Sequence, residues 1–144
     1  MTENNREHFA RKHPPGIQAD PRIAEALKQK AKGNEISCAA AFSISNDLEV
    51  PPKEVGLAVD LSGIRLAKCQ MGLFGYRPEK SVVKPAKTVT KEMEKAIRQE
   101  LVKGKLPCRQ AWDLAERFGI PKMKVASACE TLGLKISSCQ LGAF

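Results

Sequence analysis

Apolar residues recur at helical spacing in two segments of the chain, residues 21–32 and 91–103. This spacing places the apolar residues of each segment on one face of a helix, so it predicts an amphipathic helix in each segment. The stripes consist of Ile23, Ala26, Leu27 and Ala31 in the first helix and of Met93, Ala96, Ile97 and Leu101 in the second. Asp20, followed by Pro21, and Thr90 stand where N-caps are expected, so both helices have a predicted start.

The two segments belong to a longer internal repeat. A shift of 70 residues lays Ile23–Phe74, the first copy, on Met93–Phe144, the second copy, without a gap. Twelve of the 52 paired positions are identical, and many others exchange one apolar residue for another. A repeat of this regularity predicts two structural units of one kind.

The middle of each copy predicts two helices joined by a tight turn. Residues 111–130 hold a small residue, Ala115, inside the first helix and a glycine, Gly119, at the turn. A second helix can cross closely over a small residue, and glycine adopts a left-handed backbone without strain. Apolar residues that join the two helices are Leu114, Phe118, Ile120, Val125 and Ala128. Residues 41–60 follow the same pattern, except that Glu49 replaces the turn glycine.

These offsets resemble the helix-turn-helix, and the chain resembles tandem helix-turn-helix proteins of the transcription-regulator type. Short apolar pieces before the middle helix (33–37, 104–108) and after the last helix (63–69, 133–139) predict paired strands, as in a winged helix. Residues 81–85 could add a third strand to the first copy, whereas the second copy is expected to have a truncated wing. The expected fold is mainly α, with two tandem winged-helix-like repeats, each of about three helices and one or two short strands.

The segments around the repeats set the expected domain boundaries. Residues 1–19 are polar and contain Pro14-Pro15-Gly16, which predicts a flexible tail in which His8 and His13 are solvated. Residues 20–76 form repeat 1, residues 77–89 a basic, proline-containing connector, and residues 90–144 repeat 2. The turns at Gln70–Gly72 and Gln140–Gly142 are expected to fold the last phenylalanine of each copy back onto the core.

Composition and charge narrow the class of protein. Apolar residues make up 42% of the 144 residues but aromatic residues only 5%, so the core must be mostly aliphatic. No apolar run reaches the length of a membrane span, and no secretory signal is visible, so we expect a cytoplasmic protein. The net charge is +8, and the excess lies in the connector and the second copy. This asymmetry favours an anionic partner, most commonly nucleic acid.

A DNA-binding role assigns particular residues. If the second helix of the second copy enters a groove, its outward positions are Lys122, Met123, Lys124, Ala126 and Ser127. None of these residues offers a bidentate base contact, so we expect phosphate contacts to dominate. The candidate DNA-binding residues are Lys122, Lys124 and Ser127 at the groove, supported by Arg117, Lys135, Lys84 and Lys87. The equivalent helix of the first copy presents Glu54 and Leu57, which suit a protein partner better than DNA.

The cysteines leave a further alternative open. Cys38 and Cys108 are expected at the start of the middle helices, and Cys69 and Cys139 follow the last strands. Buried core positions are the simpler interpretation, because the chain lacks the tight C-x-x-C pair of most zinc and cluster sites. Cys129 is expected to pack in the core as well. We expect no cofactor and no metal, and the sequence identifies no small-molecule ligand.

Three functions follow in order of expectation. The first is a non-catalytic DNA-binding protein, because no phosphate-binding loop, nucleophile–base pair or carboxylate pair indicates an enzyme. The second is a protein-interaction or accessory subunit that uses the repeats as docking modules. The third is a thiol- or metal-linked sensor that uses the four paired cysteines.

Overall fold

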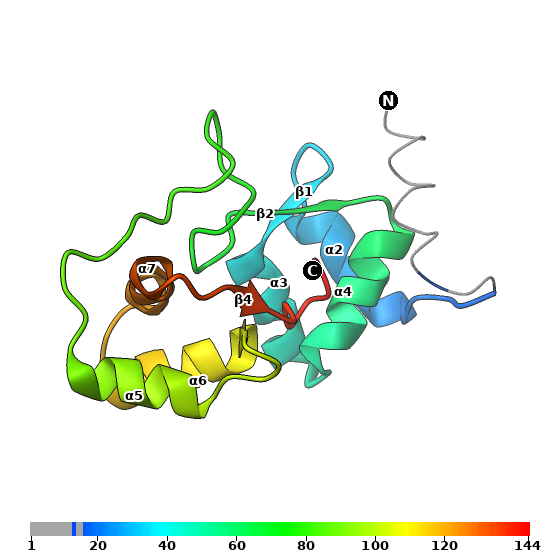
Figure 1. Cartoon of the computed structure of the whole chain (residues 1–144). Coiled ribbons are helices and arrows are strands. Elements are labelled where there is room, and N and C mark those ends of the chain that lie inside the picture. The colour runs from blue at the N-terminus through cyan, green and yellow to red at the C-terminus, as the bar shows by residue number, and fades with distance from the viewer. Residues whose placement is uncertain (1–12, 14–15) are drawn as a thin grey trace. The chain divides into compact units, whose positions relative to one another are not determined.

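The chain is mainly helical, with a few short strands (Figure 1). The computed structural model describes residue 13 and residues 16–144. Six helices and four strands occur in that part of the chain. In chain order they are α2 (Pro21–Lys30), β1 (Glu35–Ser37), α3 (Cys38–Leu48), α4 (Pro52–Leu61), β2 (Arg65–Ala67), α5 (Lys91–Gln99), β3 (Leu106–Pro107), α6 (Cys108–Phe118), α7 (Lys122–Leu132) and β4 (Ile136–Ser137).

The elements of the second copy follow those of the first at an offset of 70 residues. Helix α3 corresponds to α6 residue for residue, and α4 and α7 begin at equivalent positions. Residues 41–60 and 111–130 therefore have the same local form, two helices broken by a turn, and neither segment is a continuous rod. Helices lie in both copies where the sequence predicts them, but α2 ends at Lys30 and α5 at Gln99, before the predicted ends at residues 32 and 103.

Unit 1, one of two compact units, comprises the described residues up to Lys68 together with Gln140–Ala143. Its first helix, α2, starts as predicted, because the Asp20 side chain accepts a hydrogen bond from the N–H of Arg22 and Pro21 occupies the first helical position. Helix α2 buries Ile23 and Leu27, and the core continues with Ile44 of α3 and Val55 of α4.

Unit 2 comprises Cys69–Cys139 and Phe144. The Thr90 hydroxyl accepts a hydrogen bond from the N–H of Met93 and so caps α5, as predicted. Helix α5 turns a strongly apolar face inward, and Met93, Ala96 and Ile97 join the aliphatic core of this unit. The largest fully buried side chains of the other elements in this core are Met71, Leu106, Leu114, Val125 and Cys129.

The predicted strands pair within each copy, and both pairs are parallel. In unit 1, β1 lies beside β2 with Ile36 opposite Leu66, and in unit 2, β3 lies beside β4 with Leu106 opposite Ile136. The expected third strand is absent, because residues 81–85 form no strand in the described structure. The N–H groups of Val82 and Val83 instead donate to the carbonyl oxygen of Gly72.

The turn between the two helices has the same left-handed backbone in both copies. Gly119 after α6 has φ 65°, and Glu49 after α3 has φ 54°, a value that a residue with a side chain rarely adopts. The Ser45 hydroxyl donates to the carbonyl oxygen of Val50, and the N–H of Val50 donates to the carbonyl oxygen of Ser45. These two hydrogen bonds tie the ends of the first turn together, which helps to hold Glu49 in its unfavourable conformation.

The closing turn of each copy is part of the unit that the helices of the other copy form. Met71, in the turn of the first copy, is fully buried in the core of unit 2, and Leu141, in the turn of the second copy, is 2% exposed within unit 1. The backbone of Leu141 lies directly against Gly56 of α4, and the methyl group of Met123 in α7 lies against Gly72. The predicted turns are present, but only Phe74 packs against a core, because Phe144 is 49% exposed.

Candidate nucleic-acid interface

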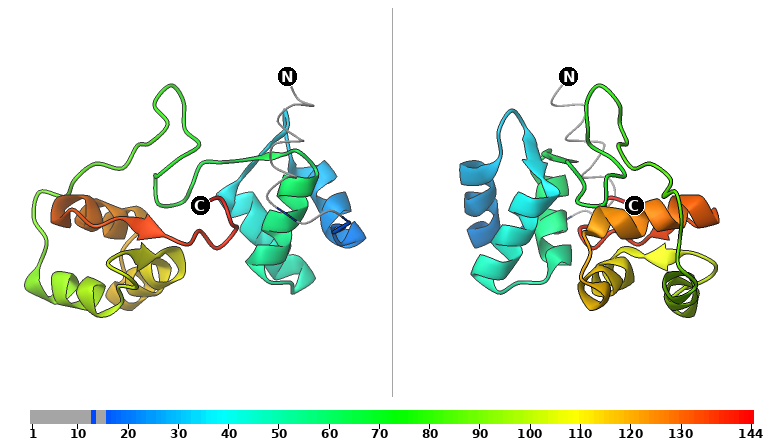
Figure 2. Two further views of the ribbon diagram at one scale, coloured as in Figure 1. Left: turned by 45° about the vertical axis from the view of Figure 1, so that its right-hand side comes forward. Right: turned by 90° about the vertical axis from the view of Figure 1, so that its left-hand side faces the viewer.

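The connector lies along α7 in unit 2. We call residues 84–89 the strap. The N–H of Ala86 donates to the carbonyl oxygen of Ser127 over 3.1 Å, and the Thr131 hydroxyl donates to the carbonyl oxygen of Ala86 over 2.7 Å. Both views of Figure 2 show the green connector crossing α7 on its way to α5. The strap is therefore an ordered part of unit 2, not a free linker.

The strap brings together four of the predicted DNA-binding residues. Lys84, Lys87, Lys124 and Ser127 all line one open cavity of about 680 Å³ between the strap and α7. The strap runs extended because proline fixes φ and has no N–H for a helix or ladder, and Pro85 sits near its start. Val89 at its other end packs against the core of unit 2, which fixes the strap on both sides.

The other three predicted residues lie elsewhere in unit 2. The ammonium of Lys122 stands 4.5 Å from the ring centroid of Trp112, and the guanidinium of Arg117 stands 5.4 Å from that of Phe118. Cation–π contacts of this kind stabilise the helix surface and leave the charge accessible. Lys135 lines a different cavity. Only the strap and the middle of α7 therefore bring several predicted cations to one place.

The outward face that the sequence predicted for α7 is largely covered. Ala126 is 1% exposed, Met123 is half-buried against Gly72, and the carbonyl oxygen of Ser127 is bonded to the strap. In unit 1, Leu57 is half-buried and not on an exposed face as expected. The reason is the same in both units: segments outside the two-helix motif pack on its second helix.

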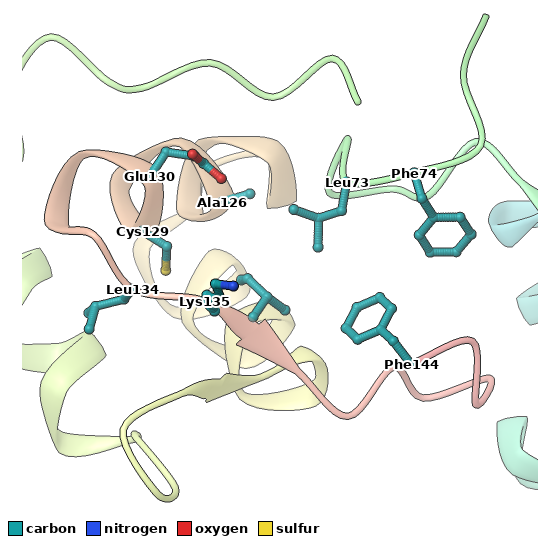
Figure 3. A pocket seen from close by; sticks show the side chains of 9 residues that line it. Leu73, Phe74, Ala126, Cys129, Glu130, Leu134, Lys135 and Phe144 are labelled. Atoms are coloured by element: carbon teal, nitrogen blue, oxygen red, sulfur yellow. The ribbon is translucent and has the colours of Figure 1, made fainter. Parts of the chain in front are cut away.

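A second, apolar cavity opens beside α7 (Figure 3). It measures about 310 Å³, and most of its lining is apolar. The rings of Phe74 and Phe144 meet edge to face with centroids 6.0 Å apart. Burial, together with the neighbouring carboxylate of Glu130, raises the pKa of the Cys129 thiol to about 11. The lining residues are Leu73, Phe74, Ala126, Cys129, Glu130, Leu134, Lys135, Ile136 and Phe144.

The cysteines are free thiols. Cys38, Cys69, Cys108 and Cys129 are buried, and Cys139 is half-buried. As predicted, Cys38 and Cys108 begin helices α3 and α6. Among residue 13 and residues 16–144, no group of three or more histidine, cysteine, aspartate or glutamate side chains could hold a metal ion.

One side-chain hydrogen bond was not predicted from the sequence. His13, expected to be solvated, places Nε2 2.8 Å from a carboxylate oxygen of Asp60, which is buried at the end of α4. The sequence feature that could have indicated this contact is Asp60, which falls on the inward side of the predicted helix. A buried carboxylate needs a hydrogen-bonding partner. His8 lies outside the described residues.

Within the described residues, no helix combines the length and the apolar character that a bilayer crossing requires. No protein-family model matches the chain, and the comparisons with curated proteins and with solved structures found no match.

Proposed function

We propose that the chain is a non-catalytic DNA-binding protein built from two tandem winged-helix-like helix-turn-helix repeats. The observation that carries the proposal is the grouping of Lys84, Lys87 and Lys124 at one cavity of unit 2. Three ammonium groups from two chain segments form a positive surface that suits the phosphates of a duplex. These three lysines supply part of the excess positive charge of the connector and the second copy.

The proposed mode of binding is contact with the backbone and not with base edges. The strap and the turn of the first copy cover the face of α7 that would enter the major groove. Lysine ammonium groups act as point charges on phosphates, and the Ser127 hydroxyl can add one hydrogen bond. Binding of this kind releases counterions, depends strongly on salt and discriminates little between sequences.

A second candidate function is docking of a protein partner. It is favoured by the apolar cavity beside α7, whose wall includes the half-exposed ring of Phe144. The partial covering of α4 and α7, the second helices of the two motifs, also fits this function, because these helices then support the docking surface and need not enter a DNA groove. The two functions use different surfaces of unit 2 and can coexist.

The DNA proposal is tested by fluorescence anisotropy with a labelled random duplex between 50 and 200 mM salt, the range over which backbone contacts lose most of their strength. The triple variant Lys84→Gln, Lys87→Gln, Lys124→Gln is expected to lower the slope of log K against log [salt] by roughly one unit for each lysine. The matched control replaces the exposed lysines of the first copy, Lys28, Lys30 and Lys32, by glutamine and removes the same charge. Equal losses in both triple variants would show that only net charge matters and would refute the assigned surface.

A further inference from the structure

Helices α4 and α7 end with acidic residues at equivalent positions. Asp60 lies near the end of α4, and a shift of 70 residues places Glu130 at the same point of α7. Each follows a fully buried residue, Val59 in α4 and Cys129 in α7, so both carboxylates leave the helix beside an apolar core. The two units thus carry a carboxylate at the same point of the repeat, buried in unit 1 and exposed in unit 2, and the structure shows what binds the buried one.

In unit 1 the anionic position binds a residue of the N-terminal segment. His13 bonds to Asp60 over 2.8 Å, and the carboxylate is almost completely buried. A buried carboxylate is stable only when it is paired or hydrogen-bonded, so this contact satisfies part of the need of Asp60. A peptide segment with a cationic or proton-donating side chain is therefore a ligand that this fold already accepts at this position.

In unit 2 the equivalent position is open. Glu130 is exposed and forms no ion pair with any residue that the structure describes. Figure 3 shows its carboxylate at the rim of the 310 Å³ cavity, above the thiol of Cys129 and opposite Leu73. The cavity offers an apolar wall for a side chain, and Lys135 at its rim can donate to a backbone carbonyl group of a bound segment.

We propose that this cavity binds a peptide segment of a partner that places a histidine or another cationic side chain on Glu130 and an apolar side chain between Leu73 and Phe144. The charge of Glu130 and the aromatic wall define the chemistry of the partner segment. The occupied position in unit 1 provides the precedent for a peptide and not a small apolar molecule. This inference does not depend on DNA binding, because the strap cavity is formed by other residues.

A labelled peptide with the sequence of residues 9–20 of this chain, FARKHPPGIQAD, is the probe, and the full chain is the receptor. Glu130→Gln is expected to weaken binding about fivefold, the scale of a solvent-accessible ion pair. Phe144→Ala is expected to weaken it about tenfold, because an aromatic anchor is lost. The matched controls, Glu116→Gln on the exposed side of α6 and Val102→Ala at another exposed apolar residue, are expected to leave the affinity unchanged.

A double-mutant cycle separates the cavity of unit 2 from any exchange of the peptide with the N-terminal segment on unit 1. A second peptide carries His13→Ala, and it is expected to bind the wild-type chain and Glu130→Gln equally well. The proposal is overturned if the first peptide binds both proteins with the same affinity, or if it binds neither. Circular dichroism of both variants shows whether the fold is intact, which is expected because both side chains are exposed.

Discussion

The carbonyl oxygen of Leu141 occupies the space in which a side chain of residue 56 would lie, so only glycine fits at Gly56. The equivalent residue in the second copy is Ala126, which is buried in unit 2. The substitution between the copies is thus explained by the close approach of one backbone to another. A substitution at Gly56 is therefore the most direct test of whether the closing turn of the second copy packs in unit 1.

Gly56→Ala is expected to destabilise the chain by about 2 kcal/mol, because the new methyl group would overlap the carbonyl group of Leu141 and force the backbone to shift. Without the contact, the same change would stabilise α4 by about 1 kcal/mol, since alanine is the better helix former. The sign of the change in the free energy of unfolding, measured with urea, decides between the two. Lys53→Ala, an exposed change in the same helix, serves as the control.

Leu141→Ala is expected to cost about 2–5 kcal/mol of unfolding free energy, the usual price of a fully buried leucine. The cost would be surprising for a residue so near the end of the chain unless its turn completes a core. Phe144→Ala, three residues later and half-exposed, is expected to cost under about 1 kcal/mol. Similar small losses in both variants would mean that the turn does not dock in unit 1.

The turn residues of the two copies should respond in opposite directions. Glu49→Gly is expected to stabilise the chain by about 1 kcal/mol, because glycine adopts the left-handed backbone without strain. Gly119→Ala is expected to destabilise it by about the same amount. Thermal and urea unfolding of the two variants would measure this, and a loss of stability in Glu49→Gly would contradict the assigned geometry.

The Cys129 thiol should make stability depend on pH in the alkaline range. The unfolded chain releases this proton near its ordinary pKa of 9.0, whereas the folded chain holds it until about 11. Between these pH values unfolding releases the proton of Cys129. The free energy of unfolding is therefore unaffected by this thiol below pH 9 and decreases as the pH rises towards 11. Urea unfolding at several pH values should show the fall, and Cys129→Ala should lack this part of it.

Local features of the fold were predictable because their causes are local. The caps at Asp20 and Thr90, the turn at Gly119 and the strands beside Ile36 and Leu106 each follow from a few neighbouring residues. The failure of residues 81–85 to form a strand was not predictable, since an apolar pair such as Val82-Val83 is compatible with several extended arrangements.

The long-range contacts left weaker signals in the sequence. The strap bonds Ala86 to Ser127 through backbone atoms, which carry no residue-specific pattern. The packing of Leu141 in unit 1 is reflected in one sequence difference, Gly56 against Ala126. That difference can be interpreted only when the position of Leu141 is known. The predicted DNA-binding set therefore separated into a group of four at the strap and three single residues elsewhere.

Because the closing turn of each copy belongs to the other unit, the two copies depend on each other for their stability. Unit 1 takes residues 140–143 from the far end of the sequence, and unit 2 begins with the last residues of the first copy. A deletion that removed either copy would thus strip the survivor of a piece of its own interior. Loss of either copy is therefore expected to destabilise the other, because each unit buries a residue of the other copy's closing turn.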